Sequence, residues 1–164
     1  MLITTYNPLV QIAKHKIKTA FSQYKRLAVA WSGGKDSTTL LALAIEVLRE
    51  NSEDWSLVIV HNDTLVENPI VREHCDKSIE ELRDYIVREN LPIEIRIARP
   101  STKETFWVNL IGKGYPLPYH NLRWCQRALK IKPFSKVVRD INAVLVGVRE
   151  KESNARKGLI NKNY

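Results

Sequence analysis

Cysteine is scarce in this sequence. Its 164 residues include only Cys75 and Cys125, which cannot form a disulfide framework and lie too far apart for a CxxC redox or zinc motif. No apolar run approaches the roughly 20 residues of a membrane span, and the N-terminus lacks an apolar core of signal-peptide length. With 6 glycines, 7 prolines and 44% hydrophobic residues, the chain is neither collagen-like nor of low complexity. We therefore expect a single cytoplasmic domain over residues 1–164, with no membrane partner.

Positive charge is present in excess and is unevenly distributed. The formal net charge is +8, and residues 113–164 carry 12 Lys/Arg against 3 Asp/Glu. Nucleic acid, the phosphates of a nucleotide or an acidic protein would each suit such a segment, and so would plain solvent. Charge alone does not choose among these partners.

The hydrophobic pattern predicts an α/β fold. Short apolar runs indicate buried strands at residues 27–31, 56–61 and 143–147, and the alternating pattern at residues 93–98 indicates a strand that is exposed on one side. Helical spacing and capping signals indicate helices at residues 8–24, 37–50, 69–86, 101–112 and 122–140. Ser101 and Glu104 form a capping-box pattern, and Pro133 is expected to interrupt the last helix. The alternation predicts a three-layer, doubly wound parallel sheet of about four strands, with ligands beyond the strands' carboxyl ends.

The turn after the first predicted strand has the chemistry of a phosphate cradle. Its glycine pair, Gly33 and Gly34, allows close approach of the backbone to a ligand. Amides at the following helix start favour an anion, Ser32 and Ser37 offer hydroxyl groups, and Lys35 adds a charge. The spacing is neither GxxxxGK[ST] nor GxGxxG. The alternative is a Gly-Gly turn with ordinary capping.

Other polar segments offer further candidate ligands. Asp63 and Glu67 follow the second predicted strand and suit ribose, adenine or Mg²⁺ contacts, or else belong to an ordinary polar loop. Gly147 allows a tight exit from the fourth strand. Arg149 and Arg156 after it can hold a phosphate or sulfate, unless they form a charged surface helix.

The two cysteines differ in their sequence surroundings. Cys125 stands among Arg123, Arg127 and Lys130, a cationic setting that favours a thiolate, although a buried structural cysteine fits nearly as well. Cys75 lies on the apolar stripe of a predicted helix and is expected to be structural.

The sequence SGGKDS at residues 32–37 resembles the pyrophosphate-binding loop of the PP-loop ATP pyrophosphatases. Together with R-x-C…LKIKP and GVREKES-x-x-R, it is similar to the phosphoadenosine phosphosulfate (PAPS) reductase family within that group. The strings HNDTLVENP, TFWVNLIGKGYP and RWCQRALKIKP resemble one branch, the DndC-type DNA phosphorothioation proteins. The resemblance runs from about residue 28 to residue 156.

The resemblance implies an ATP pyrophosphatase of the sulfurtransferase type, which hydrolyses ATP to AMP and pyrophosphate and activates a DNA backbone phosphate for sulfur transfer. ATP, Mg²⁺, DNA and other DNA sulfur-modification proteins, including a cysteine desulfurase, are the implied cofactors and partners. The implied catalytic residues are Lys35, Asp36, Cys125 and Arg149. The implied nucleotide contacts are Ser32, Gly33, Gly34, Lys35, Asp36, Ser37, Asp63, Gly147, Arg149, Glu152, Ser153 and Arg156, with Asp36 and Asp63 as Mg²⁺ ligands.

Two features of the sequence depart from the resemblance. A cluster needs about four cysteine ligands, so an iron–sulfur cluster held by the two cysteines of this chain alone is not expected. Members of the DndC-type branch are longer, so the domain is expected to be C-terminally short relative to the family. Two alternatives therefore accompany the main interpretation: a PAPS or adenylylsulfate reductase, and a non-catalytic nucleotide-binding subunit.

Overall fold

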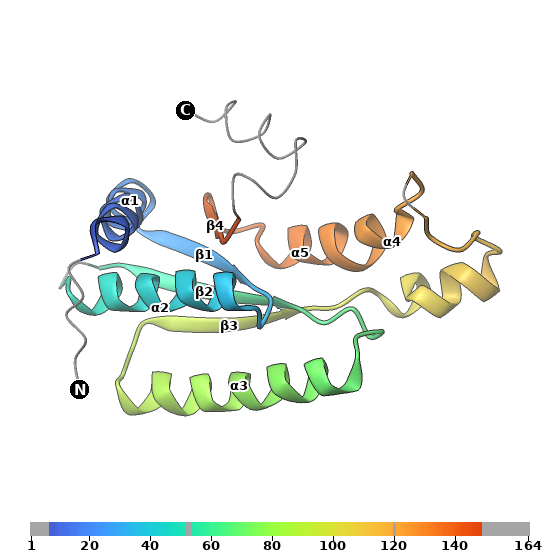
Figure 1. Cartoon of the computed structure of the whole chain (residues 1–164), viewed down its shortest axis with the longest axis horizontal. Coiled ribbons are helices and arrows are strands. Elements are labelled where there is room, and N and C mark those ends of the chain that lie inside the picture. Colours follow the sequence, from blue (N-terminus) through green and yellow to red (C-terminus); the bar gives the residue numbers. More distant parts are fainter. Residues whose placement is uncertain (1–6, 52–53, 120, 149–164) are drawn as a thin grey trace.

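A four-stranded parallel sheet forms the centre of the fold (Figure 1). The computed structural model describes residues 7–51, 54–119 and 121–148. The strands are β1 (Arg26–Trp31), β2 (Ser56–Asn62), β3 (Ile93–Ala98) and β4 (Val144–Val146), in the spatial order β3-β2-β1-β4. The chain moves outward from β1 to β3 and then returns to the other side of β1. The reversal places a topological switch point between β1 and β4, where doubly wound folds bind ligands.

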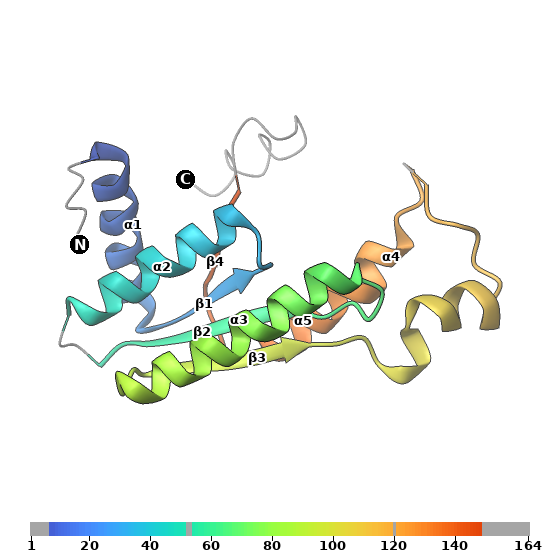
Figure 2. The same cartoon turned by 60° about the horizontal axis from the view of Figure 1, so that its bottom comes forward.

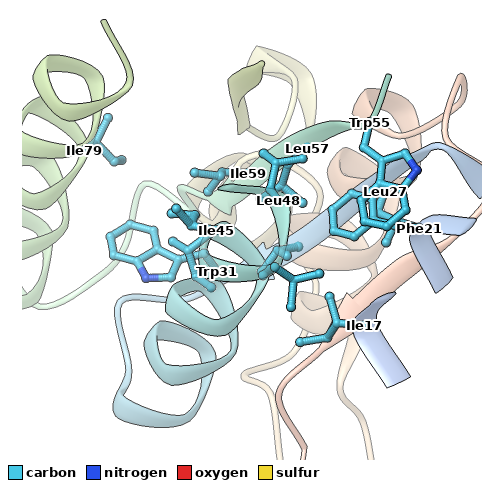
Figure 3. Close-up of a cluster of buried hydrophobic side chains, with 14 of the residues drawn as sticks. Ile17, Phe21, Leu27, Trp31, Ile45, Leu48, Trp55, Leu57, Ile59 and Ile79 are labelled. Atoms are coloured by element: carbon cyan, nitrogen blue, oxygen red, sulfur yellow. The ribbon is translucent and has the colours of Figure 1, made fainter. Parts of the chain in front are cut away.

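Three helices cover one face of the sheet. They are α1 (Pro8–Tyr24), α2 (Lys35–Arg49) and α3 (Pro69–Arg88). Their apolar stripes meet inward-facing strand residues in the larger core, and Figure 3 shows part of that core. Phe21 of α1 stacks on Trp55 with ring centroids 5.1 Å apart, and both side chains are fully buried. This stack closes the amino-terminal end of the sheet against α1.

A single helical run covers the opposite face. It comprises α4 (Trp124–Gln126), the π-helical turn η3 (Arg127–Ile131) and α5 (Lys132–Val137). Phe134 and Val137 pack on a smaller core that contains Ala28, Val58 and Val60. Figure 2 shows α2 and α3 on one side of the sheet and α5 on the other. The expected three-layer, doubly wound parallel fold is therefore confirmed.

Two local predictions were wrong. Pro133 does not interrupt the helical run, because a π-helical turn precedes it. In that turn the amide of Lys132 donates to the carbonyl of Arg127, five residues earlier, so the hydrogen-bond pattern is already wider where the proline lacks an N–H. Ser101 does not form a capping box. Its hydroxyl donates to the Glu104 carboxylate (3.4 Å), and the segment forms a 3-10 turn, η1 (Thr102–Glu104), followed by a π-helical turn, η2 (Val108–Gly112).

The segment between β3 and α4 projects beyond the carboxyl ends of the strands (Figures 1 and 2). We call residues 99–123 the arm. The side chain of Trp124 at the start of α4 donates to the carbonyl of Pro116 (2.9 Å), and Lys132 pairs with Glu104, so the start and the middle of the helical run contact the arm. Within the described ranges, no helix has the length and apolarity needed to cross a bilayer.

Candidate nucleotide site

A cavity of about 610 Å³ opens at the carboxyl ends of β1, β2 and β4. It lies at the switch point of the sheet and falls within the roughly 300–1,000 Å³ typical of small-molecule sites. Its lining contains both apolar and polar side chains. The lining residues are Ala30, Trp31, Ser32, Ser37, Val60, His61, Asn62, Glu67, Asn68, Val71, Lys130, Val146 and Gly147.

The loop after β1 forms one edge of this cavity and is held by its own hydroxyl groups. The amide of Ser32 donates to Oγ of Ser37 (3.2 Å), and the two serine hydroxyls lie 3.0 Å apart. The Ser37 hydroxyl also donates to the carbonyl of Gly34 (3.0 Å). The helix α2 begins at Lys35, two residues earlier than the spacing predicted. Its N-cap residue is Gly34, so no side chain caps the first amides of the helix. The first amides of α2 therefore remain available to an anion.

Close packing requires glycine at two positions, Gly33 within the loop and Gly147 beside it. Gly33 has φ +75°, and a Cβ there would lie 2.6 Å from Sγ of Cys75 on α3. Cys75 is buried in the larger core, which confirms its predicted structural role. A Cβ on Gly147 would lie 3.0–3.1 Å from the backbone of Asp36 and Ser37. The exit of β4 thus lies directly against the start of α2.

The two charged residues of the loop face away from the cavity wall. The side chain of Lys35 is 80% exposed and its Nζ lies 3.8 Å from Oδ2 of Asp36. Asp36 lines a different hollow, between α1, α2 and β4, together with Gly147. A flexible lysine can still reach a phosphate bound at the helix start, so the catalytic roles of Lys35 and Asp36 stay predictions.

His61 and Asn62, at the end of β2, were not predicted as site residues. His61 is buried, and its Nδ1 lies 3.2 Å from the carbonyl oxygen of Trp31. The Oδ1 atom of Asn62 is buried and has no hydrogen-bond partner among the described residues. An unpaired buried amide oxygen is costly, so a polar ligand in the cavity would satisfy it. Their position at the end of a buried strand was the available signal.

Asp63 occupies a different position from its neighbours and does not line the cavity. Its Oδ2 accepts a hydrogen bond from Nε of Arg99 (2.8 Å), and its Oδ1 accepts one from the amide of Leu65 (3.0 Å). Burial disfavours the charged form of this carboxyl, but the bonds from Arg99 and Leu65 outweigh that effect and lower the pKa of Asp63. Asp63 anchors the base of the arm, and its contact with nucleotide or Mg²⁺ stays a prediction.

The helical run brings one cation to the cavity. Lys130 of η3 is part of the lining, whereas Cys125 and Arg127, in the same block of sequence, are not. Cys125 is half-buried on α4. Arg149, Glu152, Ser153 and Arg156, expected to close the site, lie outside the described residues.

Phosphate fits the residues that are present. Glycine backbone, two serine hydroxyls, free helix amides and Lys130 converge on the cavity, and anions bind such helix starts. No cluster of three or more His, Cys, Asp or Glu residues able to hold a metal occurs within the described ranges. Mg²⁺ commonly keeps water and phosphate oxygens as ligands and needs only one or two carboxylates, and Glu67 of the cavity lining can supply one.

Fold and site together define a doubly wound α/β domain with a glycine- and serine-containing loop between its first strand and the helix that follows. Residues 26–160 match the family model described as the phosphoadenosine phosphosulfate reductase domain, and the chain belongs to this family. No curated protein matches the chain significantly in sequence.

A solved structure with the same fold is the U34-tRNA thiolase NcsA from Methanococcus maripaludis, described with its [4Fe-4S] cluster. The match has a TM-score of 0.55 and 15% sequence identity, and it covers 93% of this chain but 50% of the thiolase. The chain thus spans about half the length of that protein. A four-iron cluster does not fit the cysteines of this chain, since Cys75 is buried beneath Gly33 and only Cys125 remains.

Proposed function

We propose that this chain binds ATP in the cavity beside Ser32–Ser37 and cleaves it to AMP and pyrophosphate, activating a DNA backbone phosphate for sulfur transfer. The observation that carries the proposal is the loop itself, which closes on its own hydroxyls and leaves the first amides of α2 facing outward at the switch point. The membership of the PAPS reductase domain family supports nucleotide chemistry at this position.

The proposed reaction begins with attack of a non-bridging DNA phosphate oxygen on the α-phosphorus of ATP. A new P–O–P bond forms, the bond between the α- and β-phosphates breaks, and pyrophosphate leaves with its electron pair. The terminal sulfur of a persulfide on a partner such as a cysteine desulfurase then attacks the DNA phosphorus and displaces AMP, which carries away the former DNA oxygen. A thiol reductant then attacks the carrier sulfur of the S–S bond, which breaks to leave a disulfide on the carrier and a phosphorothioate on the DNA. The sequence of steps converts a poor leaving group, an oxide, into a good one.

The loop is suited to the first of these steps. Negative charge accumulates on the departing pyrophosphate, and the amino-terminal dipole and amides of α2 stabilise such charge. Lys130 and, after rotation of its exposed side chain, Lys35 add cationic contacts. Asn62 offers an amide to the nucleoside part of ATP.

The test is the release of AMP and pyrophosphate from α-labelled ATP by the purified chain with Mg²⁺, DNA and candidate partner proteins. Lys35→Ala is expected to reduce the rate by about 10²–10³-fold, as removal of one charge-stabilising donor does elsewhere. Lys77→Ala, on the exposed face of α3, is the matched control and should leave the rate unchanged. Full activity of Lys35→Ala, or no turnover of ATP in the complete mixture, would refute the proposal.

A second candidate is reductive cleavage of PAPS or adenylylsulfate, which the family match over residues 26–160 favours. It requires sulfite release from the sulfonucleotide in the presence of a thiol reductant. Isothermal titration with ATP, AMP and PAPS separates the two candidates at the binding step. Binding of ATP without turnover in the complete mixture would instead indicate a nucleotide-binding subunit.

A further inference from the structure

A second cavity, of about 660 Å³, lies between the arm and the helical run. It shares no lining residue with the cavity beside Ser32–Ser37, which we call the nucleotide cavity because ATP is proposed to bind there. Arg127 of η3 lines the second cavity, whereas Lys130, three residues later, lines the first. The helical run is therefore a common wall between two cavities.

The second cavity is strongly cationic. Five of its lining residues are Lys or Arg, and Glu104 is its one carboxylate, already paired with Lys132. Arg127, Lys136 and Arg139 are exposed and form no ion pair with any residue in the described ranges. Three unpaired cations around one hollow attract a polyanion.

Aromatic side chains form the end of the same cavity. Trp124 stacks on Phe106 (ring centroids 5.4 Å apart, planes 22° apart) and meets the edge of Tyr115 (5.4 Å, 85°). Its indole N–H donates to the carbonyl of Pro116, which fixes the ring. Tyr115 is 41% exposed, so its ring is accessible from the cavity.

We propose that this second cavity binds an unpaired stretch of DNA, with phosphates on Arg127, Lys136 and Arg139 and a base stacked on Tyr115. The proposal rests on the proposed function and places the acceptor strand across the helical run from the nucleotide. Cations beside an accessible ring are the combination that single strands need, whereas a duplex exposes no base face. An acidic peptide would use the cations but gain nothing from the ring.

The experiment measures binding of a labelled 12-nucleotide single strand to the full chain between 50 and 200 mM salt. The triple variant Arg127→Ala, Lys136→Ala, Arg139→Ala should bind the strand more weakly. The slope of log K against log salt concentration should be shallower by about 2, because each of the three lost phosphate contacts contributes about 0.7. The control triple Lys18→Ala, Lys77→Ala, Arg83→Ala removes the same charge from exposed positions on α1 and α3 and should change the slope little. Equal behaviour of the two triples would overturn the proposal.

The aromatic contact has a separate readout. Tyr115→Ala should weaken strand binding about tenfold without changing the salt slope, and Tyr115→Phe should restore binding because it keeps the ring. Equal or tighter binding of the matching duplex would overturn the proposal. So would competition by polyglutamate that equals competition by unlabelled strand.

Titration of ATP separates this proposal from the proposed function. The triple variant should bind ATP like the unaltered chain, since none of its three residues lines the nucleotide cavity. Strand binding that depends on Arg127, Lys136 and Arg139 supports the second cavity even where ATP turnover fails. ATP turnover without such dependence supports the first cavity and overturns the second.

Discussion

The contact between Gly33 and Cys75 allows a quantitative test of the loop geometry. Gly33→Ala places a methyl group at φ +75°, a conformation that costs L-residues about 1–2 kcal/mol. The new Cβ also lies 2.6 Å from the buried Sγ of Cys75, and overpacking of this kind costs about 1–3 kcal/mol. The free energy of unfolding should therefore fall by about 2–5 kcal/mol.

A double-mutant cycle separates the two contributions. Cys75→Ala removes the clashing atom at a cost of about 1 kcal/mol for the lost buried group. In that background, Gly33→Ala should cost only the backbone strain, so the double variant should be more stable than additivity predicts by about 1–3 kcal/mol. Urea unfolding followed by circular dichroism gives all four values.

Two other glycines, Gly34 of the same loop and Gly114 of the arm, serve as controls. Gly34→Ala should cost little, because its φ is −83° and the nearest atom, Oγ of Ser32, is 3.4 Å from the added Cβ. Gly114→Ala should show strain alone, since φ is +66° and nothing lies within 4 Å of its Cβ. Equal costs of Gly33→Ala with and without Cys75 would show that the loop does not rest on α3.

Two more outcomes follow from buried contacts. The pKa of Asp63 in the folded protein lies below its ordinary value. Asp63 therefore contributes stability that is complete above its unfolded pKa and is lost as the pH falls through its folded pKa. Arg99→Ala should remove part of this contribution, about 1 kcal/mol after allowance for the exposure of Arg99. Urea unfolding should therefore show a smaller difference in the free energy of unfolding between pH 6 and pH 3 than in the unaltered chain. Phe21→Ala deletes a fully buried ring stacked on Trp55 and should cost about 3–5 kcal/mol in the same assay, with a cost below 1 kcal/mol contradicting the described packing.

The parts of the fold that were predictable depend on local chemistry. The apolar runs that became β1 and β2 are largely buried on both faces, and such runs are recognisable without knowledge of their partners. The caps at Asn7 and Asn68 are likewise local: each side chain accepts from the amide two residues later. The loop at Ser32–Ser37 was predictable because glycine, hydroxyl and helix start lie within six residues.

Other features depend on residues distant in sequence. The partner of Asp63 is Arg99, 36 residues away, and no local pattern marks that pair. The Oδ1 atom of Asn62 is buried without a hydrogen-bond partner among the described residues, and this can be recognised only once the surrounding strands and helices are in place.

The helical run also combines a locally predictable feature with one that depends on the folded structure. An α-helix would place Arg127 and Lys130 on one side, since three residues advance about 300°. The wider π-helical turn η3 rotates each residue by less, and the two cations line different cavities. The sequence shows both residues only as members of one cationic block around Cys125.

The sequence by itself determined the strand–loop–helix cradle at Ser32–Ser37, the alternating α/β pattern and the basic character of residues 113–164, because each depends on residue type and near-neighbour spacing. Only the tertiary structure decided how those cations are divided between two cavities and which side chains complete the nucleotide cavity. The direction of a side chain on a helix depends on the phase of its turns, and burial depends on elements that meet only when the sheet is assembled.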